Sequence, residues 1–479
     1  MANKCEYRTL PDLNLARNRT QSFSFNYDGV SYPESLARYA QGKSYFIHTY
    51  GCQANYRDEE VMAGMLEHLG FKRADDISSA DVVILNTCAV RENAEQKVFG
   101  QIGELKKFKI TDKSRLFCVS GCMVQQKHII DFIIEKYKHI DLIFGTHNIT
   151  KLPQMLDEVV RKRIRLVDVE SAPSKIEENL PSKRLSSFKA FINISYGCDK
   201  FCTYCIVPYT RGKERSRLMK DILEEAKELK ELGYQEVTLL GQNVNAYGKD
   251  LKDGSSFAKL LEEVAKIGIP RVRFLTSHPW DFTEDIVDVI AKYDNIMKYI
   301  HLPVQSGSSE ILRLMGRRYD AEKYLSLVKM IRSKVPDVAL STDIIVGFPN
   351  ETYEQFLETV ELCKKIQYDS AFTFIYSPRN GTPAAKIKDN VSSKDKSFRF
   401  RELVKVLEES ISKKAFEMVG KTYDVLVEGV SEKNPEMLSG YTEKNKLIHF
   451  KGDQSLVGKI VPVKIIESHT YSMIGELVK

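Results

Sequence analysis

The alternation of strand-like and helix-like segments is the feature that most constrains the fold of this chain. From Ser44 onward, short runs rich in β-branched and aromatic residues alternate with longer runs that place apolar residues every three or four positions. Such alternation is typical of a parallel sheet covered by helices. It occurs in two blocks on either side of 170–187, which is polar, contains two prolines and has no hydrophobic period.

The first block predicts a doubly wound parallel α/β domain. Its strands are expected at 44–50, 81–86, 115–120 and 141–144, and its helices at 58–69, 92–107 and 125–137. The second block is longer and predicts a partial (β/α)6 barrel, whose site should lie at the carboxyl ends of the strands. Its strands are expected at 190–196, 236–240, 271–276, 299–304, 338–346 and 371–376, with helices that include 218–232, 257–267 and 394–418.

After 420 the helical period is lost, and short β runs at 423–428, 446–450 and 459–466 are separated by glycines. This pattern predicts a small all-β barrel. The expected domain organisation is a 1–42 extension, a 43–165 amino-terminal domain, a 166–187 linker, a 188–419 barrel and a 420–479 terminal β barrel.

Composition places the cysteines in a chemical context. The chain of 479 residues contains only nine cysteines, and no apolar run reaches the roughly 18 residues that span a bilayer. Its first residues lack the apolar region of a secretory signal, so a cytoplasmic location without membrane contact is expected. In a reducing compartment, clustered cysteines indicate metal ligation or redox chemistry. The net charge of +6 permits a polyanionic partner without requiring one.

Three cysteines, Cys198, Cys202 and Cys205, form a CxxxCxxC triplet directly after the first strand of the second block. Three thiolates in one short loop can hold a four-iron cluster and leave its fourth iron open. An open coordination position is a binding site, as in catalytic zinc centres. Zinc itself is an alternative, although it requires a fourth ligand and none lies nearby in sequence.

Three further cysteines, Cys52, Cys88 and Cys122, each follow a predicted strand of the first block. The carboxyl ends of parallel strands share one edge of a sheet, so these thiols are expected to converge into a second three-thiolate site. Taken singly, each is equally well explained as an ordinary buried cysteine. The remaining three, Cys5, Cys118 and Cys363, are predicted to have no ligand role.

With these residues in place, the chain resembles the radical S-adenosylmethionine (SAM) methylthiotransferase family from Ser44 to the carboxyl terminus. The resemblance implies an amino-terminal cluster domain, a radical SAM barrel and a TRAM-type β barrel. The residues of its motifs are most similar to those of the subgroup that makes 2-methylthio-N6-dimethylallyladenosine in tRNA, although Ala54 stands where that subgroup usually has Met. The motifs are TYGCQAN at 49–55, NTCAVRE at 86–92, GCM at 121–123 and the CxxxCxxC loop continuing through VPYTRGKERSR at 207–217.

The resemblance implies two [4Fe-4S] clusters and SAM as cofactors. The cluster on Cys198, Cys202 and Cys205 would bind SAM and cleave it reductively, and the resulting radical would remove hydrogen from C2 of N6-isopentenyl-adenosine beside the anticodon. The other cluster would hold the sulfur that is methylated and transferred. Implied partners are a tRNA anticodon arm, an external electron donor such as a flavodoxin-like protein or a chemical reductant, and an unidentified sulfur donor. No catalytic residue is predicted beyond the cluster ligands.

Four residues are expected to bind SAM on the same resemblance, namely Tyr204, Gln242, Asn243 and Gln305. Tyr204 precedes the third ligand, where the family packs the adenine of the cofactor, and a core aromatic is the alternative. Gln242 and Asn243 follow the second strand of the barrel, and Gln305 follows the 299–304 strand. An ordinary polar loop explains the two amides after the second strand about as well.

Basic residues follow two of the predicted site loops. They are Arg211, Lys213, Arg215 and Arg217, and then Arg313, Arg317 and Arg318. Contacts with tRNA phosphates, a contact with the SAM carboxylate, and a solvated helix start are all consistent with the sequence. The lysines of the terminal barrel are balanced by acidic residues, so RNA binding by that barrel is predicted from the resemblance alone.

Other functions remain as alternatives. The same chemistry can act on threonylcarbamoyl-adenosine in tRNA or on a ribosomal-protein aspartate, and the motifs around Cys52 and Cys88 disfavour both. A non-catalytic iron-sulfur RNA-binding protein or redox sensor is a different class. Two clusters that each leave an iron open are poorly suited to plain electron transfer, which disfavours that class.

Overall fold

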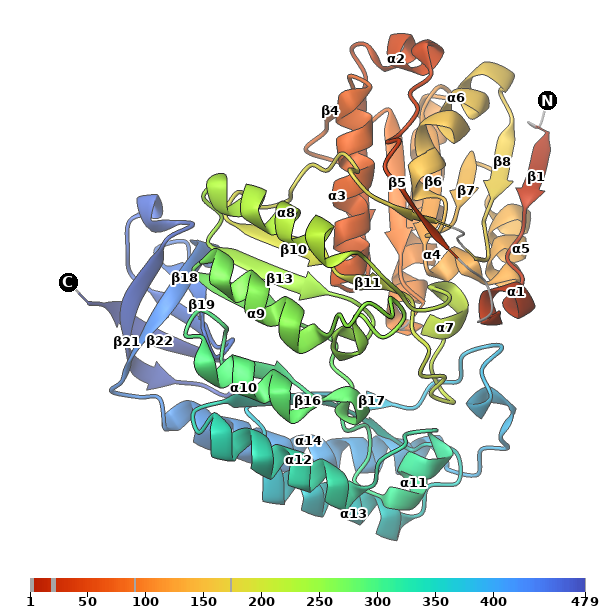
Figure 1. The fold of residues 1–479 in the computed structure, drawn as a ribbon. Helices are drawn as coiled ribbons and strands as arrows, with labels where there is room; N and C mark the ends of the chain where they lie inside the picture. Colours follow the sequence, from red (N-terminus) through yellow and green to blue (C-terminus); the bar gives the residue numbers. More distant parts are fainter. Residues whose placement is uncertain (1–3, 19–22, 90–91, 173–174, 479) are drawn as a thin grey trace. The chain divides into compact units, whose positions relative to one another are not determined.

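The computed structural model describes residues 4–18, 23–89, 92–172 and 175–478. The chain forms two compact units, which are considered separately (Figure 1). The first unit consists of Met1–Leu185, Ser195–Phe201 and Cys205–Arg217, and the second of Ser186–Ile194, Cys202–Tyr204 and Leu218–Lys479. The stretch around the CxxxCxxC loop therefore contributes residues to both units.

The first unit is built on a parallel sheet with the strand order β1-β8-β7-β6-β5-β3-β4. Its strands are β1 (Cys5–Thr9), β3 (Ser44–Thr49), β4 (Lys72–Arg73), β5 (Val82–Thr87), β6 (Leu116–Gly121), β7 (Leu142–Phe144) and β8 (Arg165–Asp168). The winding reverses at β3, because β4 pairs with one side of that strand and β5 with the other. Ligand sites of open α/β sheets lie at the carboxyl ends of the strands beside such a reversal.

Two hydrophobic cores cover the two faces of this sheet. Val82 and Ile84 of β5 belong to one core, and Val83 and Leu85 belong to the other, as the two-residue period of a strand requires. Burial on both faces explains why β5 is apolar almost throughout. The predicted doubly wound parallel domain is confirmed. The first core includes α2 (Glu34–Ala40), α3 (Gln53–His68) and α6 (Leu152–Lys162), and the second includes α4 (Glu92–Thr111) and α5 (Lys127–Lys136).

The segments predicted as an extension and a linker contribute strands to this unit, which corrects both predictions. From the 1–42 segment, β1 pairs with β8 as an edge strand and β2 (Ser24–Asn26) pairs with β9 (Lys175–Glu177) of the predicted linker. The strand β8 also extends the sheet beyond the four strands expected, and the additional helix α6 packs on one of its faces. Very short edge strands are held mainly by backbone hydrogen bonds, so they leave no hydrophobic period in the sequence.

The second unit contains six parallel strands in two runs of three, β10-β13-β14 and β15-β16-β17. An isolated parallel bridge joins Val272 of β14 to Ile296, three residues before β15 begins. The predicted partial barrel is thereby confirmed. Its strands are β10 (Lys189–Asn193), β13 (Glu236–Leu240), β14 (Arg271–Phe274), β15 (Tyr299–His301), β16 (Ala339–Val346) and β17 (Ser370–Ile375).

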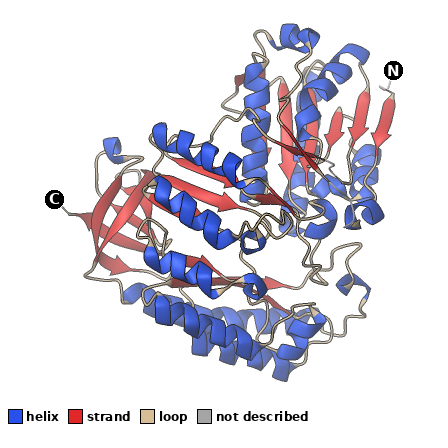
Figure 2. Cartoon of the chain, in the orientation of Figure 1, coloured by secondary structure: helices blue, strands red, loops and turns tan. Residues whose placement is uncertain are grey.

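Helices cover the outside of this partial barrel (Figure 2). They are α8 (Met219–Glu231), α9 (Phe257–Ile267), α10 (Glu284–Lys292), α11 (Ser309–Leu314), α12 (Ala321–Lys334), α13 (Tyr353–Ile366) and α14 (Ser393–Phe416). In α14, Leu403, Leu407 and Ile411 recur every four residues and are buried, which gives the helix one apolar stripe. Across the described ranges, no helix combines the length and the apolarity that a membrane span requires.

The carboxyl-terminal segment forms a closed antiparallel-rich barrel with the order β18-β19-β20-β22-β21, as predicted. Its strands are β18 (Thr422–Val430), β19 (Leu438–Thr442), β20 (Leu447–Phe450), β21 (Ile460–Ser468) and β22 (Ser472–Leu477). Arg271, the first residue of β14, donates to the carbonyl oxygens of Tyr441 at 2.8 Å and Asp424 at 2.7 Å. The terminal barrel is therefore attached at the amino-terminal edge of the strands, which leaves their carboxyl ends to the site loops.

Candidate functional site

Three cysteines of the first unit lie at the edge of the sheet where the winding reverses. Cys52 follows β3 and forms the N-cap of α3, Cys88 follows β5, and Cys122 follows β6. Because β3, β5 and β6 are neighbours in register, their following residues share this edge. Burial raises the pKa of Cys122 most, and the charges of Cys88 and Cys52 raise it further, as expected for three cysteines at the same edge of the sheet. We call Cys52, Cys88 and Cys122 the auxiliary site.

Close backbone packing sets the positions of these cysteines. Gly121 has a φ of +99°, and a Cβ there would lie 2.2 Å from the carbonyl oxygen of Thr87, so only glycine fits. The same carbonyl accepts the Cys122 backbone N–H at 2.8 Å. A Cβ on Gly51 would approach the Cβ of Cys88 to 3.1 Å. The glycines that precede Cys52 and Cys122 therefore allow neighbouring strand ends to meet closely.

Two buried asparagines connect the cysteine loops. The side-chain amide of Asn55 donates to Asn86 Oδ1 at 3.2 Å and to the Thr87 carbonyl at 3.1 Å, while Asn86 returns a hydrogen bond to the Asn55 carbonyl at 2.7 Å. Cys52 Sγ lies 3.5 Å from Asn55 Oδ1. Both asparagines belong to the motifs noted in the sequence, which did not indicate this pairing. Val90 and Arg91 of the second motif lie outside the described residues.

A buried arginine contacts the auxiliary site. Arg211 donates from Nε to Cys122 Sγ at 3.1 Å and from Nη2 to Asp58 Oδ2 at 2.7 Å. Burial opposes the charge of Arg211, but Asp58 and Cys122 outweigh it and raise the pKa of the guanidinium well above its usual value. Burial raises the pKa of the Cys122 thiol to about 12, an effect that Arg211 opposes. The sequence indicated neither this role for Arg211 nor any role for Asp58.

The short helix α7 (Val207–Thr210) carries the apolar cover of this site. Ile206 and Tyr209 form one buried cluster with Ala89 and Cys122. The residues that directly follow the CxxxCxxC triplet thus pack against a cysteine of the other triplet. This cover excludes water from the surroundings of Cys122, which strengthens the hydrogen bond from Arg211.

Burial corrects one interpretation of the basic run at 211–217. Arg211, Arg215 and Arg217 are all buried, and Arg217 forms a bidentate ion pair with the buried Glu178. Contact with tRNA phosphates is therefore wrong for these three residues, and so is a solvated helix start. In the second basic group, Arg313 is exposed and pairs with Glu310.

The CxxxCxxC triplet is divided between the units. Cys198 and Cys205 belong to the first unit and Cys202 belongs to the second. In the first unit, the Cys198 N–H donates to the Gly212 carbonyl at 3.1 Å, beside the short pair β11 (Ser195–Tyr196) and β12 (Arg215–Ser216). We call Cys198, Cys202 and Cys205 the radical site.

Cys202 also faces a buried arginine. Arg317 Nη1 lies 3.5 Å from Cys202 Sγ, and the same guanidinium donates to the Pro303 carbonyl at 2.7 Å and to the Tyr319 hydroxyl at 2.8 Å. His278 Nε2 lies 4.0 Å from Cys202 Sγ on the loop that follows β14. Against the cost of burial, Tyr319, Tyr204 and Cys202 raise the pKa of Arg317 well above its usual value.

The four residues predicted to bind SAM all belong to the second unit, and three of them lie at strand ends. Tyr204 is half-buried against the apolar cluster that contains Phe348 and Tyr376. Gln242 and Asn243 follow β13, and the Asn243 side chain donates to Asp281 at 2.7 Å. Gln305 is buried with a φ of +73°, a strained conformation that is common at binding sites. Their roles toward SAM stay a prediction.

The residues of the auxiliary site fit a four-iron cluster better than a single ion. Within the described residues, no group of three or more His, Cys, Asp or Glu side chains could hold one metal ion. A four-iron cluster makes a different demand, because each thiolate binds a different iron. Three cysteines that follow neighbouring strands supply three thiolates, and at Cys122 an apolar cover and a buried guanidinium surround the sulfur.

Comparison with protein families defines the class of the chain. Residues 192–363 match the radical SAM superfamily, residues 44–145 match a family described as uncharacterized protein family UPF0004, and residues 417–478 match the TRAM domain. Together these matches define a radical SAM protein with an additional amino-terminal domain and a terminal TRAM barrel.

Relatives with curated names resolve the family within this class. The chain is 51% identical over 469 residues to a protein of Geobacillus kaustophilus, a match that covers 98% of this chain and 88% of the relative. It is 52% identical over 471 residues to a protein of Oceanobacillus iheyensis, with 98% and 91% covered. A Bacillus subtilis protein is 50% identical over 469 residues, with 98% and 92% covered. All three are named tRNA-2-methylthio-N(6)-dimethylallyladenosine synthase, and the chain belongs to this family.

Solved structures resemble the chain in fold. The radical SAM methyltransferase TsrM of Kitasatospora setae, solved with cobalamin and a [4Fe-4S] cluster bound, has a TM-score of 0.52 at 15% identity. That match covers 72% of this chain and 74% of TsrM. At this identity the similarity extends to the fold alone.

Proposed function

We propose that the chain is a radical SAM tRNA methylthiotransferase that acts at C2 of N6-isopentenyl-adenosine next to the anticodon. The observation that carries this proposal is the identity of about half of all residues, over 98% of the chain, to enzymes named for that product. The grouping of Cys52, Cys88 and Cys122 at one sheet edge supports it, because the reaction needs a sulfur-holding site besides the radical site.

The proposed cofactors are two [4Fe-4S] clusters and SAM. When bound, they supply one-electron chemistry that breaks the C2–H bond, which no acid–base pair can address, together with the sulfur and methyl group of the product. Cys198, Cys202 and Cys205 would hold one cluster, and the auxiliary site would hold the other. Tyr204, Gln242, Asn243 and Gln305 would orient SAM at the carboxyl ends of the barrel strands.

The chain's own residues give each site a defined environment. Arg317 holds its donor toward Cys202 because Pro303 and Tyr319 fix the guanidinium. Ile206 and Tyr209 exclude water from the side of the auxiliary site that contains Cys122. Exclusion of water protects reactive radical species from side reactions.

A tRNA anticodon arm is the proposed macromolecular partner. Trp280 is exposed at 37% on the loop that follows β14, and the Arg318 guanidinium lies 4.4 Å from its ring centroid. Trp280 in turn contacts His278, which faces Cys202. An aromatic ring with a cation beside it is a stacking platform for an unpaired base. An external reductant, an unidentified sulfur donor and a cytoplasmic location complete the proposal.

Product analysis tests the function directly. The anaerobically reconstituted protein is incubated with SAM, a chemical reductant and tRNA that carries N6-isopentenyl-adenosine, and the nucleosides are analysed by mass spectrometry. We expect 5'-deoxyadenosine and the 2-methylthio nucleoside. Matched tRNAs with unmodified adenosine or threonylcarbamoyl-adenosine serve as controls. Absence of both products contradicts the function, and a methylthio product only on threonylcarbamoyl-adenosine would change the substrate.

A further inference from the structure

We propose that Arg211, held by Asp58, is a positioning residue that hydrogen-bonds the Cys122 ligand of the auxiliary cluster and sets the reduction potential of that cluster. This inference rests on the proposed function, because it presupposes a cluster on Cys52, Cys88 and Cys122. It assigns a role to Arg211 and Asp58 that their positions in the sequence, 153 residues apart, do not suggest.

The geometry is specific to one sulfur. Arg211 uses two different nitrogens, Nε toward Cys122 Sγ at 3.1 Å and Nη2 toward Asp58 Oδ2 at 2.7 Å. Asp58 lies on α3, the helix that Cys52 caps, while Arg211 directly follows α7. The ion pair thus ties the α3 side of the site to the α7 side, with the guanidinium edge directed at the thiol between them.

Burial makes this contact electrically significant. Arg211, Asp58 and Cys122 are all nearly inaccessible to solvent, with exposed fractions of 6%, 8% and 5%. Charges in such surroundings are only weakly screened by water and salt. Hydrogen bonds to sulfur, net charge and solvent exposure are the protein features that tune the potentials of iron-sulfur clusters. The first two depend here on Arg211 and Asp58, and the third depends on the apolar cover from Ile206 and Tyr209.

The sign of each contribution follows from the charge that reduction adds. A cation and a hydrogen-bond donor beside Cys122 stabilise the reduced, more negative cluster, so loss of Arg211 lowers the potential. Asp58 places a negative charge behind the guanidinium, so its neutralisation raises the potential. A purely structural pair would not shift the potential in opposite directions when either member is replaced.

The test measures the auxiliary cluster alone in the full-length chain. Cys198, Cys202 and Cys205 are replaced by alanine, and the protein is reconstituted anaerobically with iron and sulfide. Iron content, the electron paramagnetic resonance spectrum of the reduced cluster and its midpoint potential are compared for Arg211→Gln, Arg211→Lys and Asp58→Asn. We expect Arg211→Gln to weaken reduction and Asp58→Asn to favour it by about tenfold each, which is about 59 mV for one electron. Arg211→Lys keeps the charge, so its shift should be smaller than that of Arg211→Gln.

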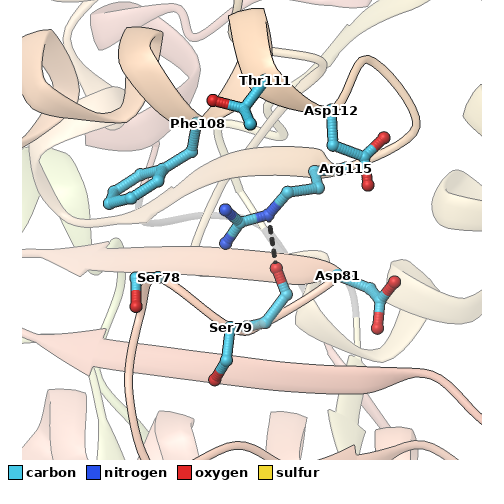
Figure 3. Close-up of a pocket in the computed structure, with 8 residues that line it drawn as sticks. Ser78, Ser79, Asp81, Phe108, Thr111, Asp112 and Arg115 are labelled. Atoms are coloured by element: carbon cyan, nitrogen blue, oxygen red, sulfur yellow. Dashed lines mark hydrogen bonds between the residues drawn. The ribbon is translucent and has the colours of Figure 1, made fainter.

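The opposite edge of the same sheet offers matched controls. Arg115 has an exposed fraction of 7% and donates to the Ala80 carbonyl, beside a small surface pocket (Figure 3). Asp141 has an exposed fraction of 5%, pairs with Lys109 and accepts the Phe117 N–H at 2.9 Å. Phe117 is separated from Cys122 by about 16 Å along β6, at about 3.3 Å per residue. Arg115→Gln and Asp141→Asn should therefore leave the potential unchanged.

Three outcomes distinguish a failure of this inference from a failure of the proposed function. Shifts of Arg211→Gln and Asp58→Asn in the same direction, or no larger than those of the controls, overturn this inference while methylthiolation by the wild-type chain upholds the function. If a single variant fails to fold, the double variant Arg211→Gln/Asp58→Asn removes both buried charges together. Its potential must then lie closer to the wild-type value than that of the single variant that folds, because the two opposite shifts offset each other. Unchanged iron content after a further Cys88→Ala replacement would place the cluster elsewhere and contradict the proposed function itself.

Discussion

Each of the two cysteine sites has a buried arginine beside one of its thiols, but the two arginines have different hydrogen-bond partners. Arg211 contacts Cys122 and is paired with the carboxylate of Asp58, whereas Arg317 contacts Cys202 and donates to the neutral Pro303 carbonyl and Tyr319 hydroxyl. Among the described residues, Arg317 therefore has no carboxylate partner, whereas Arg211 has one.

This difference matches the proposed division of labour. A site that accepts an electron and binds the carboxylate of SAM benefits from an uncompensated cation, because both additions bring negative charge. A site that stores sulfur needs its thiolate charge offset without such a strong preference for reduction. The two sites therefore differ in the counter-charge of the buried arginine, because a buried arginine is present at both.

The largest expected effect separates the two sites by loss of ligands. Cys198→Ala should abolish SAM cleavage, whereas Cys88→Ala should retain cleavage and lose the methylthio product. Cys118→Ala, which replaces a buried mid-strand cysteine of the same sheet, should retain both reactions. Quantification of 5'-deoxyadenosine and methylthio nucleoside by mass spectrometry checks all three. Loss of SAM cleavage in Cys88→Ala would contradict the proposed separation of roles between the radical site and the auxiliary site.

Removal of the uncompensated cation tests the radical site. Arg317→Gln should slow SAM cleavage about 10–100-fold, as is typical when a residue that supports a metal ligand is lost. Arg317→Lys should recover part of that rate because it restores the charge. Arg313→Gln, four residues earlier, removes an exposed arginine of an (i, i+3) ion pair and should have little effect. Equal rates of SAM cleavage for Arg317→Gln and wild type would show that the charge of Arg317 does not support the radical site.

The auxiliary site depends on a close backbone contact. Gly121→Ala should lower the free energy of unfolding by about 2–4 kcal/mol, because it combines strain at a positive φ with overpacking against Thr87. Gly100→Ala in α4, where nothing lies within 4 Å of the added Cβ, should instead stabilise by about 0.5–1 kcal/mol. Urea denaturation monitored by circular dichroism measures both. Similar values for the two variants would show that this contact is not a constraint.

The smallest expected effect concerns substrate approach to the radical site. Trp280 is the single tryptophan of the chain, so its fluorescence should be quenched when a base from an anticodon stem-loop stacks on it. Trp280→Ala should weaken binding by about 1–3 kcal/mol, the usual value of one base–aromatic stack. Phe132→Ala, at a similar exposure of 39% in the first unit, is the matched control. Unchanged affinity in Trp280→Ala would direct the search for the RNA surface elsewhere.

Local patterns predicted most of the regular structure. The ranges predicted for β13 and α9 agree with the structure, and the six barrel strands are all found. The strands β1, β2 and β9 were missed because each is short and its stability comes from a distant partner. The strand β19 was missed for a related reason, since Gly440 interrupts it where the backbone passes Leu426 closely.

For the candidate site too, features that depend on local sequence were predicted and contacts between distant residues were not. The positions of the strand ends predicted that Cys52, Cys88 and Cys122 lie at one edge of the sheet, because parallel strands share that edge regardless of the details of packing. The contacts of Arg211 and Arg317 were not predicted. A basic residue after a cysteine loop has the same local sequence whether it faces solvent, a phosphate or a thiol.

The sequence by itself determined the chemistry and the order of the domains. Thiolates, their spacing and the strand–helix period are local properties, so they are fully present in the linear chain. Only the tertiary structure decided which charges are buried and what balances them. Asp58 and Arg211 meet through long-range packing, and desolvation then makes their contact with Cys122 electrostatically strong.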